Sequence, residues 1–152
     1  MNNIDEIMAL IDWARSDEEQ KRGIEMAREV QCIRAFFQPS GPGYCKSVWG
    51  NCAHILCERQ DADLIPYVLE MLMWLQDLNW PGAEQILARL HRFEDVAILS
   101  ETIAEMIPAL VAIGEDAWLA SIAQLLIHQK LADSLDEDTK RVLAKYACHN
   151  CQ

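Results

Sequence analysis

Hydrophobic residues recur at helical spacing along most of the chain. Within residues 80–92, four apolar side chains stand at positions i, i+3, i+4 and i+7, namely Ala83, Ile86, Leu87 and Leu90. This spacing places them in one stripe along a helix. The strict alternation of apolar and polar residues that is typical of a half-buried strand is scarce. The pattern therefore predicts an all-α protein.

Capping residues and chain breakers indicate where the helices begin and end. Asn3 can cap a first helix, and residues 16–19 form a capping box for a helix running toward Phe37. Residues 134–137 form a second capping box, and two prolines with two glycines break the chain in residues 39–43. Further helices are predicted over 44–58, 63–76, 80–92, 95–113, 115–129 and 136–148.

A weak internal repeat suggests how these helices are arranged. Three segments begin with Trp49, Trp80 and Trp118, and each has a small residue three places on and an aliphatic residue one turn later. Two Ile-Pro elements, at residues 65–66 and 107–108, form a second repeated feature. Such a repeat of helical hairpins predicts a short solenoid of the HEAT or armadillo type, because stacked hairpins bury faces that one hairpin cannot. A compact irregular helical bundle is the alternative.

The predicted repeats fit a single all-helical domain over residues 1–152. In this interpretation residues 1–38 form N-terminal helices, 44–130 the hairpin repeats, and 134–152 a last helix with a tail. Pro66 falls in the first turn of its predicted helix, where proline is tolerated. Pro108 lies inside a predicted helix and predicts a kink or break near Met106.

The chain is strongly acidic, with 24 Asp and Glu against 13 Lys and Arg, a formal net charge of −11. This charge repels phosphate backbones and disfavours direct binding to nucleic acid. It suits a basic protein partner, although an acidic surface can also serve solubility alone. The first residues lack a basic signal-peptide region, and no apolar run approaches the roughly 18–20 residues of a membrane span. We therefore expect a cytoplasmic protein.

The residues capable of chemistry form no recognisable catalytic pattern. Cys148 and Cys151 have CxxC spacing, but a zinc site needs about four ligands, which would have to include a remote Cys52 or His54. Free thiols are the simpler interpretation, so we expect no metal and no cofactor. His91 and His128 are expected near helix C-termini, where they can bind the last carbonyl groups. Since no nucleophile, P-loop or paired acid–base motif is present, we expect a protein that is not an enzyme.

The stretch WLQDLNWPGA, residues 74–83, carries a more specific signal. It resembles an uncharacterised bacterial family of HEAT-like helical repeats with the signature Trp-Leu-Gln-Asp-x-Asn-Trp-Pro-x-Ala. The resemblance spans roughly residues 60–128. The residues themselves predict a hairpin corner in which Asn79 caps a helix that has Trp80 and Pro81 in its first turn. Such proteins are similar to the small immunity proteins of polymorphic toxin and contact-dependent growth inhibition systems, a likeness at the level of the fold alone.

Together these features predict an immunity protein that binds and neutralises a bacterial toxin domain in a 1:1 complex. A basic nuclease is the expected toxin, because opposite charge would steer the two proteins together. The partner-binding residues predicted at hairpin corners and helix starts are Asp77, Glu84, Glu115 and Asp116. A HEAT-like interaction scaffold or adaptor without toxin protection is the alternative.

Overall fold

The computed structural model describes residues 3–41 and 43–147, and this part of the chain contains helices and no strand. The all-α prediction is confirmed. The α-helices are α1 (Ile4–Leu10), α2 (Asp17–Arg28), α3 (Trp49–Cys57), α4 (Asp61–Leu64), α5 (Val68–Trp74), α6 (Ala83–His91), α7 (Val96–Ile113), α8 (Asp116–Ala123), α9 (Gln129–Ser134) and α10 (Glu137–Ala147). The shorter 3-10 helices are η1 (Ile33–Phe36), η2 (Lys46–Val48), η3 (Ile65–Tyr67) and η4 (Gln124–Ile127).

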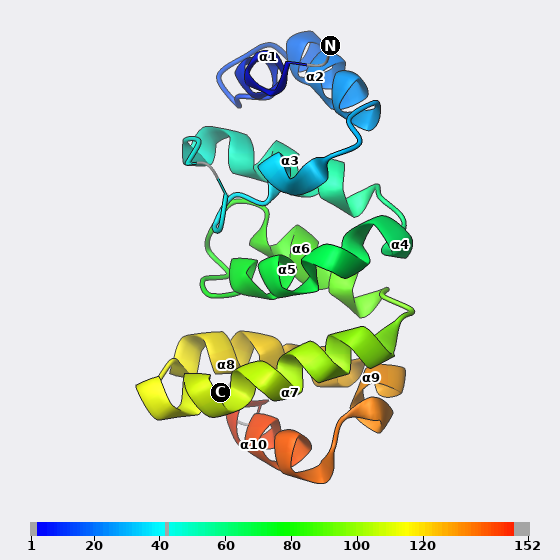
Figure 1. Ribbon diagram of the computed structural model, residues 1–152. Helices are drawn as coiled ribbons and strands as arrows, with labels where there is room; N and C mark the ends of the chain where they lie inside the picture. The colour runs from blue at the N-terminus through cyan, green and yellow to red at the C-terminus, as the bar shows by residue number, and fades with distance from the viewer. Residues whose placement is uncertain (1–2, 42, 148–152) are drawn as a thin grey trace.

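The helices pair off and the pairs stack into a column (Figure 1). α1 packs on α2, η1 on α3, α5 on α6 and α7 on α8, while α10 packs on α8 at the far end. Between layers, α2 contacts α3, α3 contacts α6, and α6 contacts η4. This is a repeat-like arrangement of helix pairs, with amphipathic helices α2 and α10 closing its two ends.

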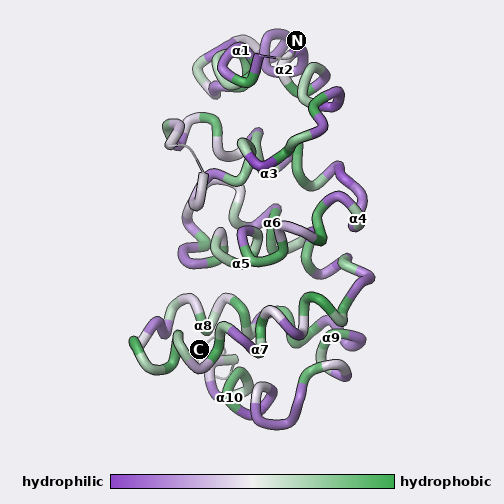
Figure 2. Tube along the Cα trace, in the orientation of Figure 1, coloured by the Kyte–Doolittle hydropathy of each residue, from purple (hydrophilic) through white to green (hydrophobic). Residues whose placement is uncertain are grey.

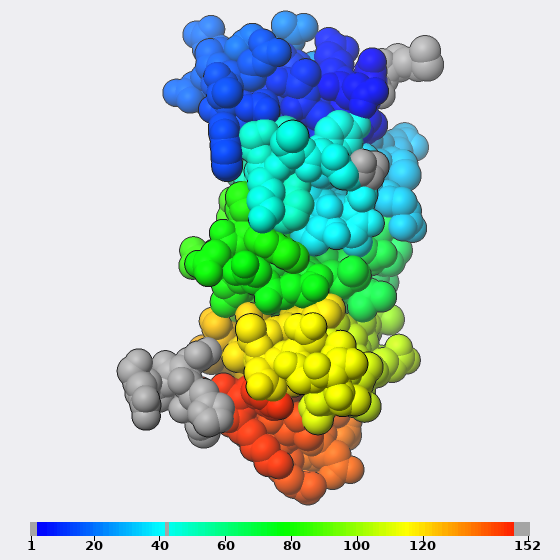
Figure 3. All heavy atoms as spheres, turned by 90° about the vertical axis from the view of Figure 1, so that its left-hand side faces the viewer, coloured from blue at the N-terminus to red at the C-terminus, as the bar shows by residue number. Residues whose placement is uncertain are grey.

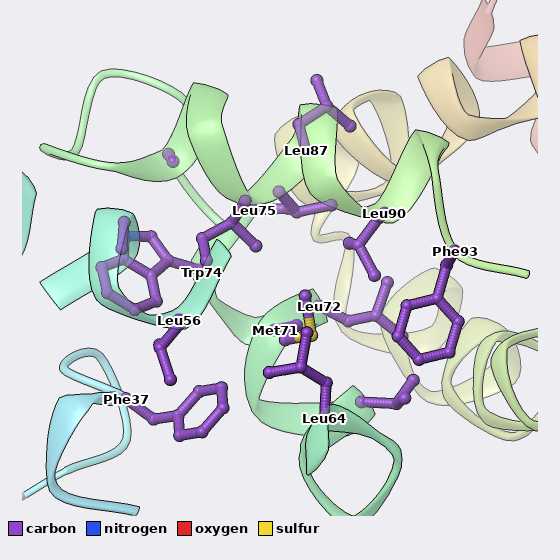
Figure 4. Close-up of a cluster of buried hydrophobic side chains, with 14 of the residues drawn as sticks. Phe37, Leu56, Leu64, Met71, Leu72, Trp74, Leu75, Leu87, Leu90 and Phe93 are labelled. Atoms are coloured by element: carbon purple, nitrogen blue, oxygen red, sulfur yellow. The ribbon is translucent and has the colours of Figure 1, made fainter. Parts of the chain in front are cut away.

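A continuous core runs through the stack (Figure 4). Trp74, Phe37 and Phe93 are almost completely buried, and aliphatic side chains from α3, α5 and α6 fill the space between them. Hydrophobic and hydrophilic residues are interspersed along the helices (Figure 2), as expected for helices that bury one face. The layers therefore share one core, and residues on both sides of the break at 39–43 contribute to it.

The predicted helix starts are partly correct. Asn3 accepts a hydrogen bond from the Asp5 amide, and Ser16 with Glu19 forms the expected capping box. The second box is wrong, because α9 still includes Ser134 and the cap of α10 is Asp136. The Asp136 carboxylate accepts from both the amide and the hydroxyl of Thr139.

The second helix stops earlier than predicted. α2 ends at Arg28 rather than continuing toward Phe37, and the chain turns into the short η1. The Arg59 guanidinium donates to the carbonyls of Ala27 and Val30 at 2.8 Å each. The Ala27 carbonyl is therefore satisfied by a side chain from the next layer, without a further helical turn.

The two internal prolines behave differently from the prediction. Pro66 lies in η3, which separates α4 from α5, so the expected helix over 63–76 is interrupted. Pro108 lies inside α7, which continues as one α-helix from Val96 to Ile113. Of the kink or break expected near Met106, the break does not occur.

Several helices end or begin at the right-hand edge of Figure 1, and hydrogen bonds from polar side chains join these ends. The Arg59 side chain binds the end of α2, and the Arg59 carbonyl in turn accepts a hydrogen bond from Arg89 at 2.9 Å. Arg89 also donates to Asp61. One layer further on, His128 Nε2 donates to the Phe93 carbonyl at 2.7 Å. The Arg59 and Phe93 carbonyls lie one residue beyond the C-caps of α3 and α6, so these bonds join the ends of neighbouring helices. His128 lies at the end of η4, but it binds a carbonyl that follows α6 and not, as was predicted, the last carbonyls of its own helix.

The tryptophan repeat is only partly a structural repeat. Trp49 is the first residue of α3, but Trp80 precedes α6 and Trp118 lies within α8. The small residues three places after them are all buried, namely Cys52, Ala83 and Ser121. The pattern therefore located the close helix contacts correctly, although it placed only one of three helix starts.

Helix α7 corrects the expectation about membrane spans. It has 18 residues with a mean hydropathy of 1.8, so by length and composition it could cross a membrane. A single such helix is weak evidence of a membrane protein, and its sequence includes two carboxylates, Glu101 and Glu105.

Candidate partner-binding surface

The corner between α5 and α6 holds Asp77 in a fixed position. Its carboxylate accepts a hydrogen bond from the Asn79 amide at 2.8 Å, and its carbonyl accepts from the Trp80 amide at 3.0 Å. The buried Trp74 indole donates to the Pro81 carbonyl at 3.0 Å and anchors the far side of the loop. The corner is thus a tight turn built on a buried aromatic side chain.

The helix that follows this corner starts later than predicted. Its N-cap is Gly82, with φ at +85°, and α6 begins at Ala83. Asn79 is therefore not the cap. A Cβ on Gly82 would meet the Cβ of Ala53 and the carbonyl of Trp49, so the left-handed backbone and the close approach to α3 both require glycine. Next to this contact, the rings of Trp49 and Trp80 pack edge-on, with 5.5 Å between their centroids.

The corner between α7 and α8 presents Glu115 and Asp116. Gly114, with φ at +75°, ends α7, and the Glu115 amide donates back to the Leu110 carbonyl at 3.0 Å. Both carboxylates are exposed at the start of α8, where the helix dipole favours negative charge. The Trp118 indole donates to the Leu72 carbonyl at 2.8 Å and ties this corner to α5.

Two adjoining surface hollows lie along α8, with Ala117 and Ala120 lining both. The first, of about 610 Å³, is bounded by Asp116 and by Lys145 and Tyr146 of α10. The second, of about 520 Å³, is bounded by the loop that contains Asp77, and also by Ser121 of α8 and Gln124, the first residue of η4. In Figure 3 the corner between α7 and α8 (yellow) lies between the green layer of α5 and α6 and the red end of α10. The fold thus brings Asp77 and Asp116 to the same part of the surface.

Tyr146 closes one side of this surface. Its hydroxyl donates to the Asp116 carboxylate at 3.4 Å. Desolvation, and then the adjacent Asp116 charge, raise the pKa of Tyr146, so the hydroxyl stays protonated at neutral pH and remains a donor.

The other predicted contact residues are placed less closely. Glu115 is exposed beside Asp116 but lines neither hollow, and Glu84 is exposed in the first turn of α6. Four lining residues were not predicted from the sequence, namely Ala117 and Ala120 of α8 and Lys145 and Tyr146 of α10. Small side chains at i and i+3 of α8 were a possible signal, but the wall from α10 could not be inferred without the fold.

Of the residues considered as zinc ligands, the structure describes Cys52 and His54, and among the described residues no group of three or more His, Cys, Asp or Glu could hold a metal ion. Cys52 is fully buried, its thiol contacts Met8 Sδ at 3.7 Å, and burial raises its pKa far above the ordinary range. His54 is exposed and lies 3.2 Å from the Glu58 carboxylate. Cys148, His149 and Cys151 lie outside the described residues.

A family model described as a domain of unknown function, DUF5071, matches residues 51–147. The chain belongs to this family. The DUF5071 match begins within α3 and ends with α10, so it includes both acidic corners and both hollows, whereas α1 and α2 lie outside it. No curated protein and no solved structure matches the chain.

Proposed function

We propose that this protein is a cytoplasmic immunity protein that binds a basic toxin domain, in particular a nuclease, in a 1:1 complex and covers its active site. The observation that carries the proposal is the position of Asp77 and Asp116 on two sides of the hollowed α8 surface, in a chain of net charge −11. A basic partner would be steered to this surface by long-range attraction and would find room there for its side chains.

Within the described residues, the carboxylates at the two corners do not have to break an ion pair to meet a basic partner. In the part of the chain that the structure describes, ion pairs engage five carboxylates, namely Glu19, Glu58, Asp61, Glu137 and Asp138. The carboxylates at the two corners, Asp77, Glu115 and Asp116, are not among them. Their charge is therefore available to a partner without the loss of an internal ion pair.

Co-expression tests the proposal directly. The product of the adjacent upstream gene should poison cells when it is expressed alone, and this protein should restore growth and co-purify with it in a 1:1 complex that weakens as salt rises. A neighbouring product that neither binds nor harms cells would contradict the proposal. Binding without any toxicity to relieve would instead favour the adaptor, for which the hollows are equally suitable.

A further inference from the structure

The hollows along α8 continue into a third one and together form a groove. The third hollow, of about 710 Å³, shares Gln124 with the second and extends to Ile127. From Asp116 to Ile127 the groove follows α8 and η4 over about 18 Å, the rise of eleven helical steps. That length matches about three turns of an α-helix.

The cross-section of the α8 groove also suits a helix. Its floor carries small side chains, Ala117 and Ala120, while the loop over residues 76–79 forms one wall and residues 145–147 of α10 form the other. Small residues allow a second helix to approach closely, and interaxial distances depend on the side chains at the contact. At the far end Ile127 is 83 % exposed and offers an apolar contact.

The charges around the groove indicate what can occupy it. Asp77 and Asp116 line it and Glu115 lies beside its entrance, whereas Lys145 is the cation among the described lining residues. A partner helix with basic residues at one end and apolar residues along one face would complement this pattern. A second copy of the chain would itself carry a net charge of −11 and would be repelled.

We infer that the α8 groove binds a basic amphipathic helix of the protein partner. This inference rests on the proposed function and specifies which element of the toxin is recognised. The apolar face of that helix lies on Ala117 and Ala120 and reaches Ile127, and its Lys or Arg residues face Asp77 and Asp116.

A model peptide tests the inference without the natural partner. The probe is a fluorescein-labelled helical peptide of 18 residues, with leucine and alanine along one face and lysines gathered at one end beside it. Binding is followed by fluorescence anisotropy. Ala120→Trp fills the floor without a change of charge and should weaken binding by at least about tenfold. Ala97→Trp, at an exposed position in the first turn of α7, is the matched control and should leave binding within about twofold.

Each other outcome is decisive. Equal affinity of the Ala120→Trp protein and the control, or no binding at all, would overturn the inference, and Ala117→Trp at an exposed floor position gives the same test if Ala120→Trp fails to fold. Tighter peptide binding after replacement of residues 148–152 by Gly and Ser would assign the groove to the chain's own tail. Dimerisation, or binding to lipid vesicles, that Ala120→Trp abolishes would assign it to a second copy or to a membrane. If the unchanged protein and its Ala120→Trp variant protect cells from the toxin equally well, the proposed function stands and the groove inference is refuted.

Discussion

Replacing Arg89 by methionine should remove the contact that joins three layers at one edge of the stack. The Arg89 side chain is 7 % exposed, donates to the Arg59 carbonyl, and pairs with Asp61, which in turn accepts from the Glu94 amide at 2.7 Å. Backbone and side-chain bonds, including that pair, keep the pKa of Asp61 below its usual value in spite of the opposing effect of burial. Asp61 is thus ionised at neutral pH and would lose its cation.

The magnitude follows from these contacts. Removing one partner of a buried ion pair costs about 3–5 kcal/mol, and each hydrogen bond to a charged group contributes about 1.5–3 kcal/mol. Because the Asp61 side chain is 23 % exposed and keeps the bond from Glu94, water can restore part of the loss. We expect Arg89→Met to lower the free energy of unfolding by about 3 kcal/mol, which shifts the urea midpoint down by roughly 1.5 M.

The matched control is Arg28→Met, which makes the same substitution in another arginine–carboxylate pair. Arg28 donates two bonds to Glu58, but its side chain is 55 % exposed, so water replaces the lost contact and the midpoint should change little. Urea unfolding of both variants, followed by circular dichroism at about 222 nm, gives the comparison. Equal midpoints for the two variants would refute the reasoning that burial makes the Arg89 contact strong.

Three further predictions concern single sites. Gly82→Ala should destabilise the protein by more than about 1 kcal/mol because of the positive φ and the contact with α3, whereas Gly50→Ala, where a Cβ meets open space, should be neutral or slightly stabilising in the same unfolding assay. Burial, and to a smaller extent the charge of His128, lowers the pKa of His91. The contribution of His91 to stability should therefore be lost as pH falls below about 6.5, and His91→Gln should flatten that part of the stability–pH curve. In native protein with Cys148 and Cys151 replaced by serine, a thiol reagent should modify exposed Cys32 quickly and buried Cys52 only upon unfolding; fast modification of Cys52 would contradict its burial.

The sequence was sufficient to predict the helices whose stripes are strong and whose caps are local. The Ser16 box and the stripe of α6 depend on residues within one or two turns, so short-range spacing reveals them. The early end of α2 depends on Arg59, which lies about thirty residues away, and no local pattern contains that information. Likewise Asp136 is the cap of α10 because α9 occupies the residues just before it.

The candidate surface was predictable in its charges but not in its shape. Asp77 and Asp116 could be named because corners and helix starts favour carboxylates. Their positions on two sides of the same hollowed helix follow from the stacking of α8 beneath the corner of α5 and α6, which Trp118 secures through the Leu72 carbonyl. Tyr146 and Lys145 join the surface only because α10 folds back on α8.

The most direct test of the proposed function is calorimetric titration of this protein with the purified product of the adjacent upstream gene. The double variant Asp77→Asn and Asp116→Asn removes both charges, and the side-chain oxygen of residue 77 can still accept from the Asn79 amide. The control, Glu25→Gln with Glu101→Gln, changes the charge equally at exposed positions of α2 and α7. We predict a 1:1 complex whose dissociation constant rises about fivefold or more in the double variant and with salt from about 50 to 300 mM, and stays within about twofold in the control. A dissociation constant that neither the two charges nor salt changes would contradict the assignment of this surface to a basic partner.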